Sequence, residues 1–209
     1  MIVDAHLDIG WNAISSGRGF LLPPAPGYVV SRSSLVAAEV GLVFATLYTA
    51  PARATRSMRT RFVYENAHEA NLMATAQVNY YRASGLDLIG TRDELAAYAR
   101  NWRKGRLAAI LLMEGADPIE TPAQLGAWTD RGVRIIGPAW GRTRYSGGTG
   151  APGGLTDLDG GFGARYAPID RLARLKELPP RLRMHFNKTQ VEGIMGSNWL
   201  SFLERSLPE

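Results

Sequence analysis

The feature that most constrains the fold is the run of residues 107–113, in which all seven side chains are apolar. Such a run predicts a strand that is buried on both faces, as in a parallel sheet covered by helices. The segments 2–7, 40–47 and 133–139 are also predicted to be strands, and the last two are nearly as apolar.

Helical patterns lie between these strands. Apolar residues recur at spacings of three and four over residues 60–84, and Gly85 follows as a C-cap. The segment 91–101 opens with the capping-box pair Thr91 and Glu94, and 121–131 has a proline in its first turn. The alternation predicts parallel β/α units.

The remaining segments are less regular. The sequence is polar from Asp8 on, and a loop rich in Gly and Pro is expected at 15–27, followed by a short helical turn or loop at 31–39. The alternation stops after residue 139, where 140–163 is dense in glycine and shows neither helical nor strand periodicity. The tail predicts an amphipathic helix that opens with a capping box at 189–192 and is interrupted by Gly196.

The composition predicts a globular protein and argues against membrane and nucleic-acid partners. With 209 residues, 45% of them apolar and 21% charged, the chain is expected to form a globular core. No apolar run approaches the roughly 20 residues of a membrane helix, and the N-terminus has no signal-peptide pattern, so a cytoplasmic protein with no membrane partner is expected. The net charge of +5 comes from scattered arginines, which favours a solvated basic surface and predicts no nucleic-acid partner.

The candidate chemistry begins at the end of the first strand. His6 and Asp8 stand two residues apart, a spacing that points both side chains to one face. Strand ends of this kind face the active site in β/α folds, so an imidazole nitrogen and a carboxylate oxygen there could bind one metal ion. The alternative is a strand end followed by a turn-forming aspartate. Because the chain has no cysteine, any metal must be held by carboxylates and by its three histidines.

Two further acidic segments are candidates for the same site. Glu114 follows the apolar run directly, and a buried carboxylate needs a cation or hydrogen bonds, the alternative being bonds to loop amides near Gly115. Asp157 and Asp159 could accept a proton from a metal-activated water, although Asp before Gly is also common in turns. The other two histidines, His68 and His185, are expected on the surface.

These segments together resemble a known family. The motifs DAHLD, LLMEG, GVRIIGPAWGRTRYSGG, DLDGGFG and VEGIMGSNWLSFL, in this order, are similar to the membrane dipeptidase family of zinc peptidases, family M19. The resemblance implies a TIM barrel with two zinc ions that cleaves dipeptides. It assigns His6 and Asp8 to one zinc, Glu114 to the bridge between the two, and Asp157 to proton handling.

The sequence departs from that family at one place. The loop that resembles the one after the fourth strand runs directly into the DLDGG segment, so strands five to eight are expected to be missing, with the histidines of the second zinc. The expected fold is therefore an α/β, incomplete TIM-barrel-like domain over 1–209, with about four parallel β/α units and C-terminal helices. Residues 1–156 would form the half-barrel and 157–209 the C-terminal segment.

The function expected from this resemblance is zinc-dependent hydrolysis of a small dipeptide, with one zinc site at most and no identified substrate-binding residue. The alternative is a non-catalytic remnant that acts as a structural or interaction protein. Four strands cannot close a barrel, so the open face is expected to be covered in a homodimer or by the tail helices.

Overall fold

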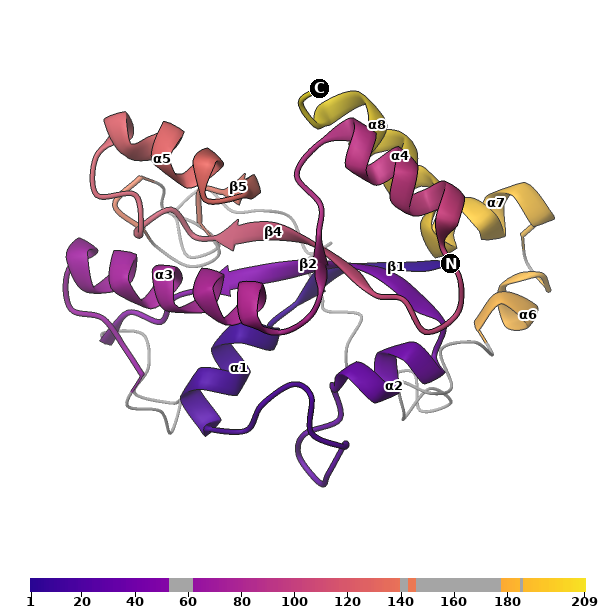
Figure 1. Cartoon of the computed structure of the whole chain (residues 1–209), viewed down its shortest axis with the longest axis horizontal. Helices are drawn as coiled ribbons and strands as arrows, with labels where there is room; N and C mark the ends of the chain where they lie inside the picture. Colours follow the sequence, from indigo (N-terminus) through magenta and orange to yellow (C-terminus); the bar gives the residue numbers. More distant parts are fainter. Residues whose placement is uncertain (53–61, 140–142, 146–177, 185) are drawn as a thin grey trace.

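A computed structural model describes residues 1–52, 62–139, 143–145, 178–184 and 186–209. None of the helices in these residues is long and apolar enough to cross a membrane. The chain forms a parallel sheet with helices on both sides (Figure 1).

The sheet consists of four longer strands and one short one. They are β1 (Ile2–Leu7), β2 (Val40–Tyr48), β3 (Asp87–Leu88), β4 (Ala108–Glu114) and β5 (Val133–Gly137). The order is β1-β2-β4, and both β3 and β5 pair with β4, all in parallel. Within the described residues the sheet does not close, which confirms the predicted incomplete barrel of about four β/α units.

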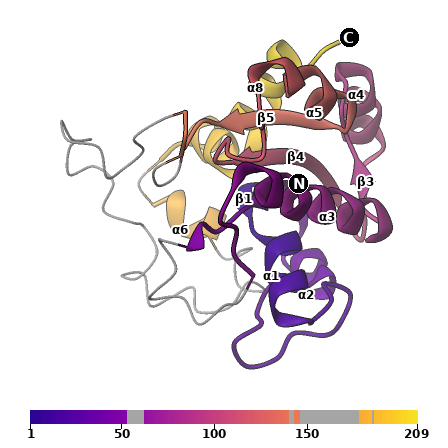
Figure 2. The same cartoon turned by 90° about the vertical axis from the view of Figure 1, so that its left-hand side faces the viewer.

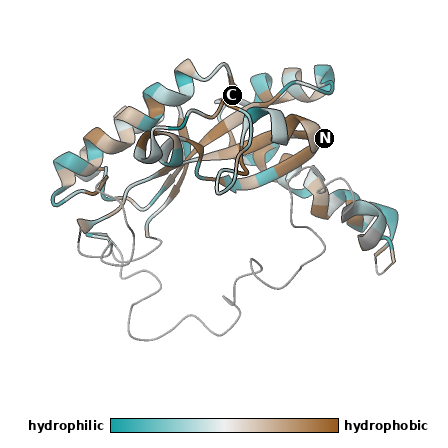
Figure 3. Ribbon diagram, turned by 90° about the horizontal axis from the view of Figure 1, so that it is seen from below, coloured by the Kyte–Doolittle hydropathy of each residue, from teal (hydrophilic) through white to brown (hydrophobic). Residues whose placement is uncertain are grey.

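Four helices cover one face of the sheet. These are α1 (Ile9–Ser16), α2 (Arg32–Ala37), α3 (Ala67–Ala83) and α5 (Leu125–Asp130), the last preceded by the 3-10 turn η2 (Pro122–Gln124). Tyr81 of α3 and Trp128 of α5 are fully buried against alternate residues of β2 and β4, such as Val43 and Leu111. The strands are the most apolar part of the molecule (Figure 3).

The opposite face, here called the inner face, would line the interior of a closed barrel. Its amino-terminal half carries Leu42, Phe44 and Ile110, which pack against α4 (Arg92–Asn101) and α8 (Asn198–Ser206). These two helices lie side by side on the side of the sheet opposite α1 and α2 (Figure 1, Figure 2). The tail therefore supplies one of the two expected covers, while a homodimer stays a prediction.

Three further elements complete the tail: α6 (Leu178–Leu182), α7 (Lys188–Glu192) and the π-helical turn η6 (Gly193–Ser197). The predicted interruption at Gly196 is present, because the backbone departs there from helical geometry. Gly196 also lies against β1, where an added Cβ would stand 2.9 Å from Cγ2 of Val3. The predicted capping box was misplaced by two residues: Asn187, not Thr189, caps α7, with Gln190 as its partner.

Two other boundaries differ from the sequence prediction. Residues 9–16, expected to be irregular, form α1, which ends at Gly17 in the left-handed conformation that glycine adopts readily (φ 70°). The helix predicted over 60–84 begins only at Ala67, because the Asn66 side chain accepts a hydrogen bond from the backbone N–H of Glu69 and caps it there.

Candidate metal centre

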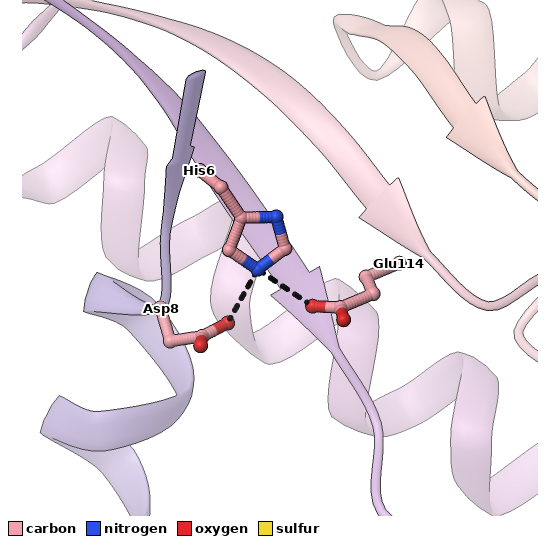
Figure 4. A group of neighbouring side chains, drawn as sticks. All are labelled: His6, Asp8 and Glu114. Carbon is pink, nitrogen blue, oxygen red and sulfur yellow. Dashed lines mark ion pairs between the residues drawn. The ribbon is translucent and has the colours of Figure 1, made fainter. Parts of the chain in front are cut away.

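His6, Asp8 and Glu114 meet at the carboxyl end of the sheet (Figure 4). His6 Nε2 lies 3.1 Å from Glu114 Oε2 and 3.8 Å from Asp8 Oδ1. One ligand atom from each residue lies within 4.8 Å of the other two, and this is the single such group among the described residues. The structure therefore brings together all three predicted metal ligands.

Strand register explains this convergence. Tyr48 pairs with Glu114 and Leu7 pairs with Ala45, so the ends of β1 and β4 reach the same edge on either side of β2. Even-numbered residues of β4 point to the inner face, and Glu114 continues that series after Ile110 and Leu112. The Glu114 side chain is 12% exposed and that of His6 is 49% exposed, so the group opens to solvent on the side of His6.

Asp8 stands at the N-cap position of α1, but its side chain makes no capping hydrogen bond. Its carboxylate instead accepts a hydrogen bond from the Thr46 hydroxyl on β2 and faces His6. Burial raises the pKa of Asp8, an effect that the negative charge of Glu114 increases and the Thr46 hydrogen bond opposes. The partly buried carboxylates of Asp8 and Glu114 lie close together, so a positive charge at this edge would be stabilising.

A protonated His6 would supply part of that positive charge. The hydrogen bond to Glu114 is the main cause that raises the His6 pKa, and burial opposes it. The Nε2 atom of the imidazole points toward the two carboxylates, and the backbone N–H of His6 donates to Asp4 Oδ1 at 3.0 Å.

The donor set fits a zinc ion chemically, because zinc binds imidazole nitrogen and carboxylate oxygen. Tetrahedral ligands at about 2.1 Å from zinc lie roughly 3.4 Å apart. The two separations from His6 Nε2, 3.1 and 3.8 Å, lie on either side of that value, and all three ligand atoms lie within 4.8 Å of one another.

Two residues that were not predicted as part of the site, Thr46 and Gln77, form hydrogen bonds close to it. Thr46 is the one hydroxyl-bearing residue in the otherwise apolar run 40–47, and that exception was a usable signal. Gln77 occupies a fully buried position of α3, and its side-chain amide exchanges hydrogen bonds with the backbone of Tyr48 at 3.1 and 2.6 Å. A glutamine at a core position of the helical pattern was a second signal.

Hydrogen bonds connect three of the segments that follow the strands. The buried carboxylate of Asp117 accepts hydrogen bonds from the Tyr64 hydroxyl and from the backbone N–H of Arg144, the latter at 2.9 Å. Arg144 also donates to the carbonyl oxygen of Ile119 at 2.8 Å. Tyr64, Asp117 and Arg144 line an open cavity of about 280 Å³. These contacts join the segments after β2, β4 and β5.

The other candidate residues are placed as follows. Asp157, Asp159 and His185 lie outside the described residues, so their predicted roles stay predictions. His68 lies on α3 with an exposed side chain, as expected, and its Nδ1 is 3.0 Å from Glu120 Oε1. It takes no part in the metal centre.

Comparison with known proteins gives structural matches only. No protein-family model matches the sequence, and the search of curated proteins finds no match. The dipeptidase AC, a metallopeptidase of family M19, is similar over 68% of this chain and 43% of its own, with 19% identity and a TM-score of 0.50.

Two other solved structures agree with this match. A metallopeptidase from Rhodobacter sphaeroides, solved with a phosphinate mimic of the dipeptide L-Ala-D-Ala, is 18% identical over 68% of this chain and 46% of its own (TM-score 0.52). A probable dipeptidase from Pseudomonas aeruginosa is 13% identical over 65% of this chain and 34% of its own (TM-score 0.50). The chain thus spans less than half the length of the structures it matches. It has the fold of part of the M19 metallo-dipeptidases, the family that its sequence motifs resemble.

Proposed function

We propose that the protein is a zinc-dependent hydrolase of the dipeptidase type, which cleaves a small dipeptide. The observation that carries this proposal is the convergence of His6, Asp8 and Glu114 at the carboxyl edge of a sheet with the M19 fold. Sequence motifs, fold and donor geometry are three separate lines of support for it. Membership of the M19 family by descent is part of the proposal.

The three residues would hold one zinc ion, and three protein ligands are the usual number in catalytic zinc sites. When bound, zinc would polarise the peptide carbonyl and lower the pKa of a water molecule. Glu114 and Asp8 supply the negative charge that retains the cation, and the half-exposed imidazole of His6 leaves access from solvent. We propose Asp157 as the group that accepts a proton during hydrolysis.

We propose at most one zinc per chain, because the described residues offer a single group of three ligands. Residues 1–209 would form one shortened domain, with 1–156 as the half-barrel and 157–209 as the C-terminal segment. Zinc content by elemental analysis and hydrolysis of Gly-Leu test both the metal and the reaction.

Matched histidine variants make this test specific. We expect His6→Ala to lose zinc and activity, whereas His68→Ala should keep both, because His68 pairs with Glu120 away from the centre. A folded wild-type protein that neither binds zinc nor hydrolyses dipeptides would favour the alternative, a non-catalytic remnant. Equal loss in the two variants would also contradict the assignment of the site.

A further inference from the structure

We propose that Tyr81 and Thr46 are positioning residues that hold the Asp8 carboxylate in place for the metal. This inference rests on the proposed function, because it assigns a support to the same centre. Neither residue would bind the metal itself, and both act through hydrogen bonds. Asp8 lies in the turn between β1 and α1, so its position depends on the contacts of that turn with the sheet and with α3.

Tyr81 provides the first link between that turn and the sheet. Its hydroxyl accepts a hydrogen bond from the backbone N–H of Gly10 and donates one to the carbonyl oxygen of Thr46, each at 2.8 Å. The side chain is fully buried. One hydroxyl therefore joins the first turn of α1 to the carboxyl-terminal part of β2, and it comes from α3.

Gly10 fits this arrangement closely. A Cβ atom added there would lie 3.1 Å from two ring atoms of Tyr81, which is tighter than ordinary contact. The ring thus packs directly against the backbone of α1 two residues after Asp8. The helix start cannot move toward α3 without a clash or away from it without loss of the hydrogen bond to Tyr81.

Thr46 provides the second link, and it reaches Asp8 directly. Its backbone carbonyl is held by Tyr81, and its side-chain hydroxyl donates to Asp8 Oδ1. Oδ1 is also the atom that lies 3.8 Å from His6 Nε2. The same residue is therefore fixed by Tyr81 at its backbone and orients the ligand oxygen with its side chain. Partners of this kind around a metal ligand change metal affinity by about 10- to 100-fold.

A matched tyrosine separates positioning from general stability. Tyr98 is also buried, and its hydroxyl donates to a backbone carbonyl of the same strand, that of Gly41 at 2.6 Å, but at the amino end of β2. Both Tyr81→Phe and Tyr98→Phe remove one buried hydroxyl and should lower the thermal unfolding midpoint of the metal-free protein. Only Tyr81→Phe should weaken zinc binding, measured by competition with a chelating dye, by about 10-fold or more.

A second pair of variants tests Thr46 and covers a Tyr81 variant that does not fold. Thr46→Val keeps the shape of the side chain but removes its hydroxyl and should weaken zinc binding. Thr46→Ser keeps the hydroxyl and should restore most of it. Because Tyr81 and Thr46 act on the same carboxylate, their effects on zinc affinity should not add in the double variant.

The outcomes distinguish this inference from the proposed function. If the wild type binds zinc and both Tyr81→Phe and Thr46→Val bind it equally well, the positioning role is overturned. The proposed metal centre is then unaffected. Equal weakening by Tyr81→Phe and Tyr98→Phe would reduce the effect to stability and overturn the positioning role as well. A wild-type protein that takes up no zinc would refute the proposed function and, with it, this inference.

Discussion

His6 can serve a proton or a metal ion at Nε2, but not both at once. In the metal-free protein the hydrogen bond to Glu114 raises the pKa of His6 above its usual 6.5. Zinc needs the unprotonated nitrogen, so proton and metal compete for the same lone pair. The residue that anchors the site also makes it sensitive to pH near neutrality.

Two quantities should therefore change in opposite directions with pH. A raised His6 pKa stabilises the metal-free fold below pH 6.5, and this contribution is lost as pH rises through the folded-state pKa. Zinc affinity should rise over the same range, by up to about a factor of ten per pH unit for the one proton released. Chelator-treated unfolding and zinc titration between about pH 6 and 8 measure the two.

Substitution of the partner provides the control. In metal-free Glu114→Gln the main cause of the shift is gone, so the His6 pKa in an NMR titration should fall toward its usual value. Assignment of the imidazole signals is practical because the chain has three histidines. An unchanged His6 pKa in Glu114→Gln would contradict the hydrogen bond as the cause.

Among the elements, α8 covers part of the inner face of the open sheet. Leu203 is almost fully buried over the inner face, and Trp199 packs its ring edge-on against Phe44 at 5.3 Å between ring centroids. The end of the chain is fixed as well, because Arg92 of α4 donates through Nε to the carbonyl oxygen of Leu207 at 2.7 Å. The tail helix fills a space that a closed barrel would fill with side chains of its own strands.

Truncation of Leu203 should accordingly be costly. We expect Leu203→Ala to lower the free energy of unfolding by about 2–5 kcal/mol, the usual range for a buried leucine. Leu72→Ala is the matched control, because Leu72 lies on α3 with 55% of its surface exposed and should change stability by less than about 1 kcal/mol. Urea denaturation measures both, and a similar small effect of the two variants would show that α8 is not part of the core.

Local sequence signals predict some of the helices and strands but not others. The strand β4 follows from an uninterrupted apolar run and α4 from the Thr91 capping box, which are local signals, whereas the two-residue strand β3 was not predicted. The helix α1 was not predicted because its eight residues include Gly10 and several polar residues, and its N-cap Asp8 directs its carboxylate to Thr46 and His6 rather than to the helix. A local rule is broken there by a functional contact, as is common at sites.

The convergence of the three candidate ligands could be predicted from the sequence, whereas their role as metal ligands stays a prediction. His6, Asp8 and Glu114 each break the apolar pattern at a strand end, and parallel strands bring such ends to one edge. The role of Tyr81 was not predicted, because its hydrogen bond with Gly10 joins residues 71 positions apart in the sequence. A tyrosine also fits the apolar pattern of α3 without that hydrogen bond. Long-range hydrogen bonds of this kind leave little trace in local sequence.

For the whole molecule, the metal centre and the helical cover lie at different parts of the inner face. Leu203 packs over the amino-terminal half of the strands, whereas Glu114 ends β4 at the carboxyl edge. Folding stability and metal binding should therefore be separable by mutation, although binding to the native state alone still links them by mass action.

Zinc should accordingly raise the thermal unfolding midpoint in a concentration-dependent way. At 100 times the dissociation constant the gain is about 2.7 kcal/mol, or roughly 5–10 °C for a chain of this size. A chelator should reverse the shift. Leu203→Ala should unfold at a lower temperature but respond to zinc by a similar amount, because its missing side chain lies away from the ligands. If the zinc response disappears in Leu203→Ala, or is absent from the wild type over a wide range of zinc concentrations, the centre is not an independent site on this half-barrel.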